Sequence, residues 1–393
     1  MGFLFSSSKK DRLVAVFDIG SGSIGGAIVK IPILENKIPM ILESVRTDIP
    51  YRKDFNFDIF MKDMLLTLEK TANSLYGKKI GAPDEIFCIL SSPWYLSETR
   101  TIRMSKEKPF IFTKRISSDL IQKEVLSLNE LYKSKYNDLE STPEVIEQLI
   151  MAVSLNGYAV EDPIGQKCNF FEMNMVISLS PALCLNKMRD TLSKIFHSTN
   201  IKFSSFTLAT YIAIRDKYIN EDSYLLLDVS GEITDVGIVT KGVLRSVLSF
   251  PFGRKTFFEY ICTKLDIELR DAKELFKLYN EENLSDELKK KIVPLLDSIK
   301  NSWGEAFNQS IKTLPRILAL PSTIFLTTDN DIKKLFADTI CNDQYIKITT
   351  SVGECNVVTL DGPDFIHMCD IKGGSCDPFL MIESIAITRK ITK

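Results

Sequence analysis

The stretch Tyr-Leu-Leu-Leu-Asp-Val-Ser-Gly-Glu-Ile-Thr-Asp-Val-Gly-Ile-Val, residues 224–239, joins two apolar runs through a short polar turn. Apolar runs of this length are typical of buried strands. Small residues and Gly231 in the turn allow successive backbone N–H groups to converge on an anion, and Asp228 at the end of a strand is suited to hold hydrated Mg²⁺. The same pattern also describes an ordinary hairpin, so this stretch alone leaves both interpretations open.

A second hairpin of the same design lies near the N-terminus. Apolar residues 13–17 precede Asp18, a small-residue turn follows, and residues 24–31 resume an apolar strand. Two such turns facing each other would enclose a phosphate chain, with Asp18 and Asp228 directed towards Mg²⁺. Neither turn has the spacing of a P-loop, and the first turn leads into a strand rather than a helix, which argues against a dinucleotide fingerprint.

The paired turns resemble the two phosphate loops of the actin and sugar-kinase ATPase superfamily. The resemblance is closer to the bacterial FtsA family and to its relative, the PilM family, and extends from about residue 14 to about residue 335. It implies an α/β, actin-like (ribonuclease H-like) two-domain fold with a small inserted α+β subdomain. It also implies ATP with Mg²⁺ as ligands, bound at Asp18, Gly20, Ser21, Gly22, Ser23, Asp228, Ser230, Gly231 and Thr234.

A third part of the implied site is a Glu-x-x-Lys pair. Glu274 and Lys277 are three residues apart within an expected helix and therefore share one face. The resemblance assigns the carboxylate to the ribose hydroxyls and the lysine to the side of the base. The alternative is a solvated helical ion pair, which contributes only a few tenths of a kcal/mol.

Two positions depart from the family pattern. Glu232 replaces a glycine beside the implied phosphates, and Thr328 with Asp329 replaces a Gly-Gly turn that would admit the nucleoside close to the backbone. A carboxylate beside a polyphosphate is repulsive unless a cation bridges the two. Weak or absent nucleotide binding is therefore an alternative, and it leads to the hypothesis of a nucleotide-free scaffold.

A break at Ser91, Ser92 and Pro93 and a change of composition from Trp94 onwards mark one boundary, and the resemblance implies three units. Residues 1–91 and 172–212 are expected to form actin-like domain I, residues 92–171 the inserted subdomain, and residues 213–393 actin-like domain II. The insert carries no acid/base cluster, which favours a protein-contact surface, although an insert without a partner remains open.

Overall composition limits the classes of partner. The chain has 393 residues, 45% of them hydrophobic, and its 49 Lys+Arg nearly balance 51 Asp+Glu, so no basic field indicates nucleic acid. The eight cysteines include no Cys-x-x-Cys pair, which argues against structural zinc. No apolar run is long enough to span a bilayer, so a soluble or peripheral protein is expected.

The C-terminal segment carries an apolar pattern at helical spacing, at Phe379, Leu380, Ile382, Ile385 and Ala386. Basic residues follow it, as in an interfacial helix against anionic lipid. Packing of the same helix on domain II is the alternative.

The resemblance as a whole predicts an FtsA-like cell-division protein that binds ATP and links an FtsZ-like filament to the inner face of the cell membrane, with self-association into filaments possible. The first alternative is a PilM-like type IV pilus assembly adaptor that binds a pilus-platform protein; the others are a scaffold of the same fold without nucleotide and a metabolite kinase. No general base is identifiable, so ATP binding is favoured over efficient hydrolysis and the catalytic residues stay unknown.

Overall fold

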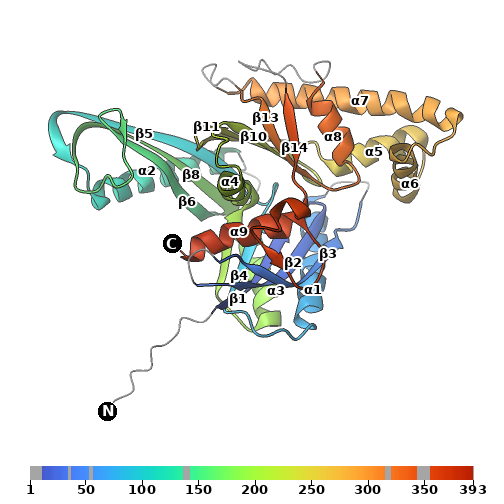
Figure 1. Ribbon diagram of the computed structural model, residues 1–393, viewed down its shortest axis with the longest axis horizontal. Helices are drawn as coiled ribbons and strands as arrows, with labels where there is room; N and C mark the ends of the chain where they lie inside the picture. Colours follow the sequence, from blue (N-terminus) through green and yellow to red (C-terminus); the bar gives the residue numbers. More distant parts are fainter. Residues whose placement is uncertain are drawn as a thin grey trace, which may run out of the picture.

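The computed structural model describes residues 11–33, 37–52, 56–135, 142–314, 320–342 and 355–392. Figure 1 shows two sheet-and-helix domains with a third, smaller sheet projecting to one side. The α/β class and the two-domain arrangement with an inserted subdomain, expected from the sequence, are confirmed.

The first sheet is six-stranded, in the order β15-β3-β2-β1-β4-β9. Its strands are β1 (Arg12–Ile19), β2 (Ser23–Ile31), β3 (Met40–Asp48), β4 (Glu85–Leu90), β9 (Ile201–Ser205) and β15 (Asp370–Ile371). β1 pairs antiparallel with β2 and parallel with β4. Side chains of β1 alternate between the two faces: Val14 and Val16 belong to one core, and Ala15 and Phe17 to the other. Both faces are covered, which explains the continuous apolar run.

The second sheet repeats this arrangement. Its order is β12-β11-β10-β13-β14, with β10 (Tyr224–Val229), β11 (Thr234–Thr240), β12 (Val243–Phe250), β13 (Thr323–Thr328) and β14 (Asn356–Thr359). β10 pairs antiparallel with β11 and parallel with β13, as β1 does with β2 and β4. The two hairpins found in the sequence are therefore equivalent elements of two similar domains.

Helices cover the outer faces of both sheets. α1 (Phe57–Tyr76) and α3 (Ala182–Phe196) pack on the first sheet, and α5 (Arg254–Leu265), α6 (Leu269–Asn280), α7 (Asp286–Ile311) and α8 (Lys333–Ile340) lie in the second domain. α7 continues through Pro294, where the sequence predicts an interruption. Pro294 and Lys290 are both exposed, so solvent can bind the carbonyl that the proline leaves without its helical N–H donor.

Two helices form the layer between the sheets. α4 (Phe206–Lys217) and α9 (Pro378–Thr392) pack on each other, and their core includes residues of both sheets, such as Val14 and Leu226. Figure 1 shows α9 crossing beside the first sheet, below α4. A short 3₁₀ helix, η1 (Gly362–Phe365), precedes this return of the chain.

The C-terminal segment corrects the predicted domain limits. Residues 213–393 do not all form domain II, because β15 extends the first sheet and α9 packs on β1 and β2. The side chains of Leu380 and Ile382 have no exposed area, and Ile385 is 2% exposed. The apolar stripe considered for a lipid surface therefore lies in the core, against the first domain rather than the second.

The inserted subdomain is a four-stranded antiparallel sheet, ordered β5-β8-β6-β7, with one helix. It comprises β5 (Leu96–Ile111), α2 (Lys114–Lys135), β6 (Pro143–Leu155), β7 (Tyr158–Ala159) and β8 (Lys167–Pro181). The expected boundary at residue 171 falls inside β8, because this strand pairs with the insert strands β5 and β6 as far as Pro181. The polar composition of residues 132–143 is typical of a loop, but residues 132–135 continue α2, and residues 136–141 lie outside the described part of the chain.

Candidate functional site

The two small-residue turns meet face to face between the domains. Ser21 Oγ lies 3.2 Å from Ser230 Oγ, and the backbone N–H of Glu232 donates to Ser21 Oγ at 2.9 Å. A Cβ on Gly231 would lie 2.7 Å from Gly22 Cα, closer than real Cβ atoms approach. The glycines thus permit direct contact of one turn with the other.

A small cavity of about 30 Å³ remains where the turns meet. Eight of the residues expected to bind nucleotide line it: Asp18, Gly20, Ser21, Gly22, Ser23, Asp228, Ser230 and Gly231. The rest of the wall is formed by Arg46, Ser91, Val229, Asp329 and Phe379. The structure therefore brings the two predicted turns together, but the space between them holds only a few water molecules.

Asp18 forms a buried ion pair. Its Oδ2 lies 2.7 Å from Arg46 Nη2, and the same guanidinium binds Asp377 through Nε at 2.6 Å. Burial, which outweighs the attraction of Arg46, raises the pKa of Asp18 to about 6. The guanidinium itself has its pKa raised, because Asp377 and Asp18 outweigh the effect of burial. The carboxylate implied for Mg²⁺ thus already has a cation from the protein.

Asp228 is also buried, near the end of β10. Its Oδ1 accepts a hydrogen bond from Thr327 Oγ1 at 2.9 Å. Burial and the nearby Asp235 raise the pKa of Asp228 well above its ordinary value. Asp235 joins the two domains, since its Oδ1 accepts from Ser92 Oγ at 2.7 Å and from Ser249 Oγ at 2.6 Å.

The remaining predicted residues do not line the small cavity. Thr234 has no exposed area; its Oγ1 donates to the Phe252 carbonyl at 2.6 Å and lies 3.1 Å from Trp303 Nε1. Glu274 and Lys277 are exposed on α6 and line neither the small cavity nor the larger one described next. The structure gives Thr234 a packing role and leaves the Glu-x-x-Lys pair on the surface.

The three side chains that depart from the family pattern, Glu232, Thr328 and Asp329, form contacts with other groups of the protein. Lys255 Nζ lies 2.8 Å from Glu232 Oε1, which balances the charge that would repel a phosphate. Thr328 Oγ1 donates to the Val229 carbonyl at 2.9 Å, and Asp329 Oδ2 lies 3.4 Å from Arg254 Nε. Each of the three side chains therefore has a partner within the protein.

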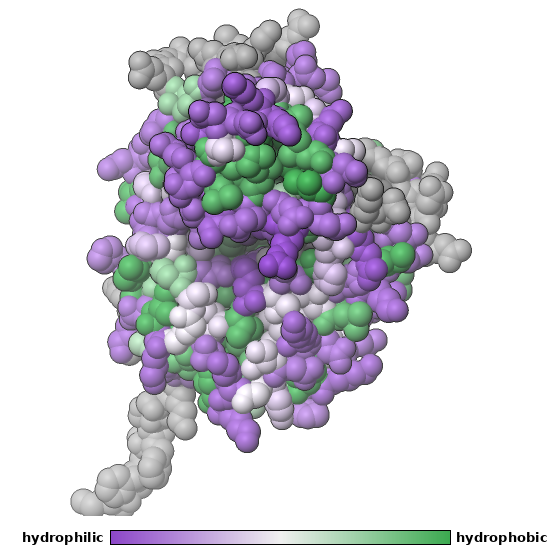
Figure 2. Space-filling model, turned by 90° about the vertical axis from the view of Figure 1, so that its right-hand side faces the viewer, coloured by the Kyte–Doolittle hydropathy of each residue, from purple (hydrophilic) through white to green (hydrophobic). Residues whose placement is uncertain are grey.

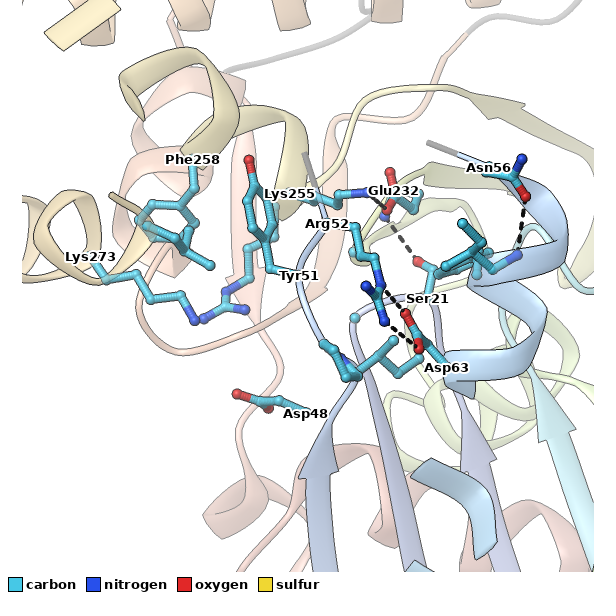
Figure 3. A pocket seen from close by; sticks show the side chains of 18 residues that line it. Ser21, Asp48, Tyr51, Arg52, Asn56, Asp63, Glu232, Lys255, Phe258 and Lys273 are labelled. Carbon is cyan, nitrogen blue, oxygen red and sulfur yellow. Dashed lines mark hydrogen bonds and ion pairs between the residues drawn. The ribbon is translucent and has the colours of Figure 1, made fainter. Parts of the chain in front are cut away.

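A larger cavity of about 270 Å³ opens on the other side of the turns, between β3, α1, α5 and α6. Figure 2 looks onto this side of the molecule, where hydrophilic residues gather between the upper and lower parts. Figure 3 shows Tyr51 and Phe258 on one wall, with Arg52 bound to Asp63 and Lys255 bound to Glu232. No motif in the sequence indicated this cavity, since its walls come from distant segments.

The described residues do not fit ATP with Mg²⁺ in this conformation. The turns touch where a phosphate chain would pass, and Asp18 is paired with Arg46. Among the residues described, no group of three or more His, Cys, Asp or Glu is arranged as a metal site. The role of Arg46 could not be predicted from the sequence, because nothing in the neighbouring residues distinguishes it from a strand residue exposed to solvent.

Comparison with known proteins gives similarity in structure only. No protein-family model matches the chain, and no curated protein matches it in sequence. The chain is similar to a structure described as the PilM-PilN type IV pilus biogenesis complex, with a TM-score of 0.59 and 10% identity over 98% of this chain and 99% of that chain.

Two further solved structures align less well. The ethanolamine utilization protein EutJ from Carboxydothermus hydrogenoformans has a TM-score of 0.43 and 8% identity, over 96% of this chain and 89% of that chain. A Bacteroides thetaiotaomicron protein of actin-like ATPase fold and unknown function has a TM-score of 0.37 and 10% identity, over 93% and 97%. With its duplicated hairpins and inserted sheet, and its similarity to the PilM-PilN structure along nearly the whole chain, this protein has the actin-like fold expected from the sequence.

Proposed function

We propose that this chain is an assembly adaptor of the PilM type, which acts by binding a pilus-platform protein. The observation that carries the proposal is the similarity to the PilM-PilN structure, which covers 98% of this chain and 99% of that chain. Two turns in direct contact suit a protein that acts through its surfaces. The similarity supports this role rather than the FtsA-like division role with an FtsZ-like filament.

The C-terminal helix is not available as a lipid anchor. An FtsA-like anchor needs a free amphipathic helix, whereas α9 has its apolar residues in the core. No helix in the described part of the chain combines the length and apolar character needed to cross a membrane. We propose that the adaptor acts at the inner face of the membrane, held there by its pilus-platform partner.

A groove of about 490 Å³ beside β9 is the surface we assign to that partner. β9 is the last described strand of its sheet, and the groove lies between it, β6 and the end of α9. Its lining carries four cations, Arg12, Arg189, Lys202 and Lys390, which pair with Glu85, Glu144 and Glu147 of the chain. Four cations against three glutamates leave a net positive charge, which favours a segment with acidic side chains.

The test measures binding of the purified PilN-type protein from the same genome by calorimetry. Wild type should bind it, and Lys202→Glu should bind at least about tenfold more weakly, because the change reverses one charge in the groove. Lys114→Glu, in the separate cavity beside α2, is the matched control and should bind like wild type. Binding to FtsZ without binding to the PilN-type protein would reverse the assignment in favour of division.

A further inference from the structure

We propose that Arg46 is a built-in cation that takes the place of an external ligand in this cleft and ties α9 to the first sheet without nucleotide or metal. The inference goes beyond the adaptor role, because it concerns what replaces MgATP in the cleft. The residues present do not fit ATP with Mg²⁺, the ligand that the family resemblance implies.

The guanidinium of Arg46 uses each of its nitrogens. Nη2 lies 2.7 Å from Asp18 Oδ2, Nε donates to Asp377 Oδ2 at 2.6 Å, and Nη1 donates to Ser23 Oγ at 2.9 Å. A Cβ on Gly25 would lie 2.7 Å from Nη2, so the glycine makes room for the guanidinium. Planar, charge-assisted contacts of this kind are more specific than those of a single point charge.

The partners of Arg46 come from opposite ends of the chain. Asp377 Oδ1 also accepts from the backbone N–H groups of Phe379 and Leu380, at 3.0 and 3.2 Å, and so fixes the first turn of α9. The Phe379 ring centroid lies 5.0 Å from Arg46 Cζ, and Phe379 lines the small cavity between the turns. The C-terminal segment therefore reaches the same cavity as the first turn.

The acids around Arg46 require a cation. Asp18 and Asp377 both lie within 2.7 Å of the guanidinium, and the fully buried Glu383 lies beside Asp18. Without a positive group, this cluster would bring carboxylates together in a site of low dielectric constant, which is strongly unfavourable. Arg46 supplies the charge from within the chain.

The test is rescue of Arg46→Ala by a small cation. The variant should unfold at a Tm several degrees below that of wild type, and ethylguanidinium at millimolar concentration should recover part of the loss by entering the vacated space. Ethylurea, which has nearly the same shape without the charge, should not. Arg52→Ala removes an arginine whose side chain is 55% exposed and which pairs with Asp63, so it is the matched control and should show no rescue.

Wild type should give no calorimetric signal with MgATP up to millimolar concentration. Equal rescue by ethylurea, an unchanged Tm in Arg46→Ala, or micromolar MgATP binding by wild type would each overturn the proposal. Should Arg46→Ala fail to fold, Arg46→Lys replaces it, with an intermediate Tm expected since one charge is kept. Partner binding is measured separately, so failure of this proposal and failure of the adaptor role are distinguishable.

A second, independent observation concerns two cysteines. Cys341 ends α8 and Cys355 precedes β14, and their Sγ atoms lie 3.0 Å apart. Cys341 is exposed and therefore accessible to reagents. We infer that this pair is a site of reversible oxidation to an intramolecular disulfide by a small disulfide such as oxidised glutathione.

The reaction is an exchange of thiols with a disulfide. One cysteine thiolate attacks the small disulfide and releases one small thiol, giving a mixed disulfide; the second cysteine then attacks the protein sulfur and releases the other small thiol. Both protein thiols lose their protons, and the two electrons reduce the small disulfide. The short distance between the sulfurs favours the second step over accumulation of the mixed disulfide.

Oxidised glutathione should remove two thiols from the native protein, lower its mass by two hydrogen atoms and raise its Tm by a few degrees, because the cross-link restricts the unfolded chain. Cys341→Ser should abolish all three changes. Cys376→Ser, at another exposed cysteine, should leave them intact. A stable glutathionyl adduct, or no loss of thiols, would contradict the inference.

Discussion

At the scale of single residues, Gly22 and Gly231 determine how closely the two domains approach. Each belongs to a turn between two strands, and each has the backbone of the other within the space of a side chain. Hydrogen bonds complete the contact: one joins the hydroxyls of Ser21 and Ser230, and the backbone N–H of Glu232 donates another to Ser21 Oγ. A residue larger than glycine at either position must therefore separate the turns.

Gly231→Ala should destabilise the protein by about 1 to 3 kcal/mol, because the added methyl group meets the backbone of Gly22, which cannot move as a side chain would. Chemical denaturation measures the loss. Gly77→Ala is the control: Gly77 has φ −60° and its nearest atom would lie 3.3 Å away, so a change within about 0.5 kcal/mol is expected. Equal losses in both variants would show that the contact between the turns is not the cause.

Glu383 predicts a pH dependence. Burial, with Asp18 nearby, raises the pKa of Glu383 well above its ordinary value, so the folded state retains a proton that the unfolded chain releases above about pH 4.3. The stability that this group contributes is fully present below the unfolded pKa and is lost as the pH rises towards the folded pKa. Glu383→Gln keeps the shape and cannot ionise.

The variant should therefore be more stable than wild type at pH 8, by at least about 1 kcal/mol, with the difference closing near pH 4. Denaturant unfolding at several pH values measures both curves. A constant difference across this range would mean that Glu383 does not titrate on unfolding.

At the scale of elements, α9 joins parts of the molecule that are distant in sequence. Its first turn binds Arg46 of β3 through Asp377. Near its end, Lys390 Nζ lies 2.5 Å from Glu147 Oε1 of β6 and 2.6 Å from Ser204 Oγ of β9. The helix thus connects the first sheet, the insert and the edge strand, in addition to filling the core.

Lys390→Ala should cost about 1 to 3 kcal/mol, since Glu147 is buried and loses its cation, while the partial exposure of Lys390 moderates the loss. In Glu147→Gln, the same lysine change should cost less, and the difference in a double-mutant cycle gives the coupling. The exposed Lys372 serves as the control, with Lys372→Ala expected to be neutral. If the free-energy costs of the two single changes simply add up in the double variant, the ion pair between Lys390 and Glu147 does not link α9 to the insert.

At the scale of the whole molecule, the two domains share a core. α4 and α9 pack together between the sheets, and Asp235 of the second domain binds Ser92 of the first. A shared layer and closed turns couple the domains, so they should unfold together.

The two tryptophans test this coupling, because Trp94 lies in the first domain and Trp303 in α7 of the second. Trp94→Phe leaves a probe of the second domain, and Trp303→Phe leaves a probe of the first. Their fluorescence transitions in urea should coincide, and adding Ser21→Ala with Ser92→Ala to each should separate them by weakening the contacts between domains. Separate transitions in the parent proteins would mean that the shared layer does not couple the domains.

Much of the architecture was predictable from local pattern. Apolar runs ending at Asp18 and Asp228 indicate the duplicated hairpins, and the spacing of Phe60, Met64 and Leu68 indicates α1, because strand and helix periods are properties of adjacent residues. The candidate site was less predictable. Residues of the two turns meet, whereas Thr234 is buried in the core and Glu274 with Lys277 stays on the surface.

The sequence by itself determined the strands, the turns and the similarity of the two halves, since glycine, aspartate and apolar periodicity act over a few residues. Only the tertiary structure decided that Arg46 neutralises Asp18, that the turns touch, and that the C-terminal helix returns to the first domain. Those features depend on groups such as Asp18 and Asp377, which are hundreds of residues apart in the chain. Their charges and shapes match only after folding has brought them to one place, and spacing in the sequence contains no measure of that distance.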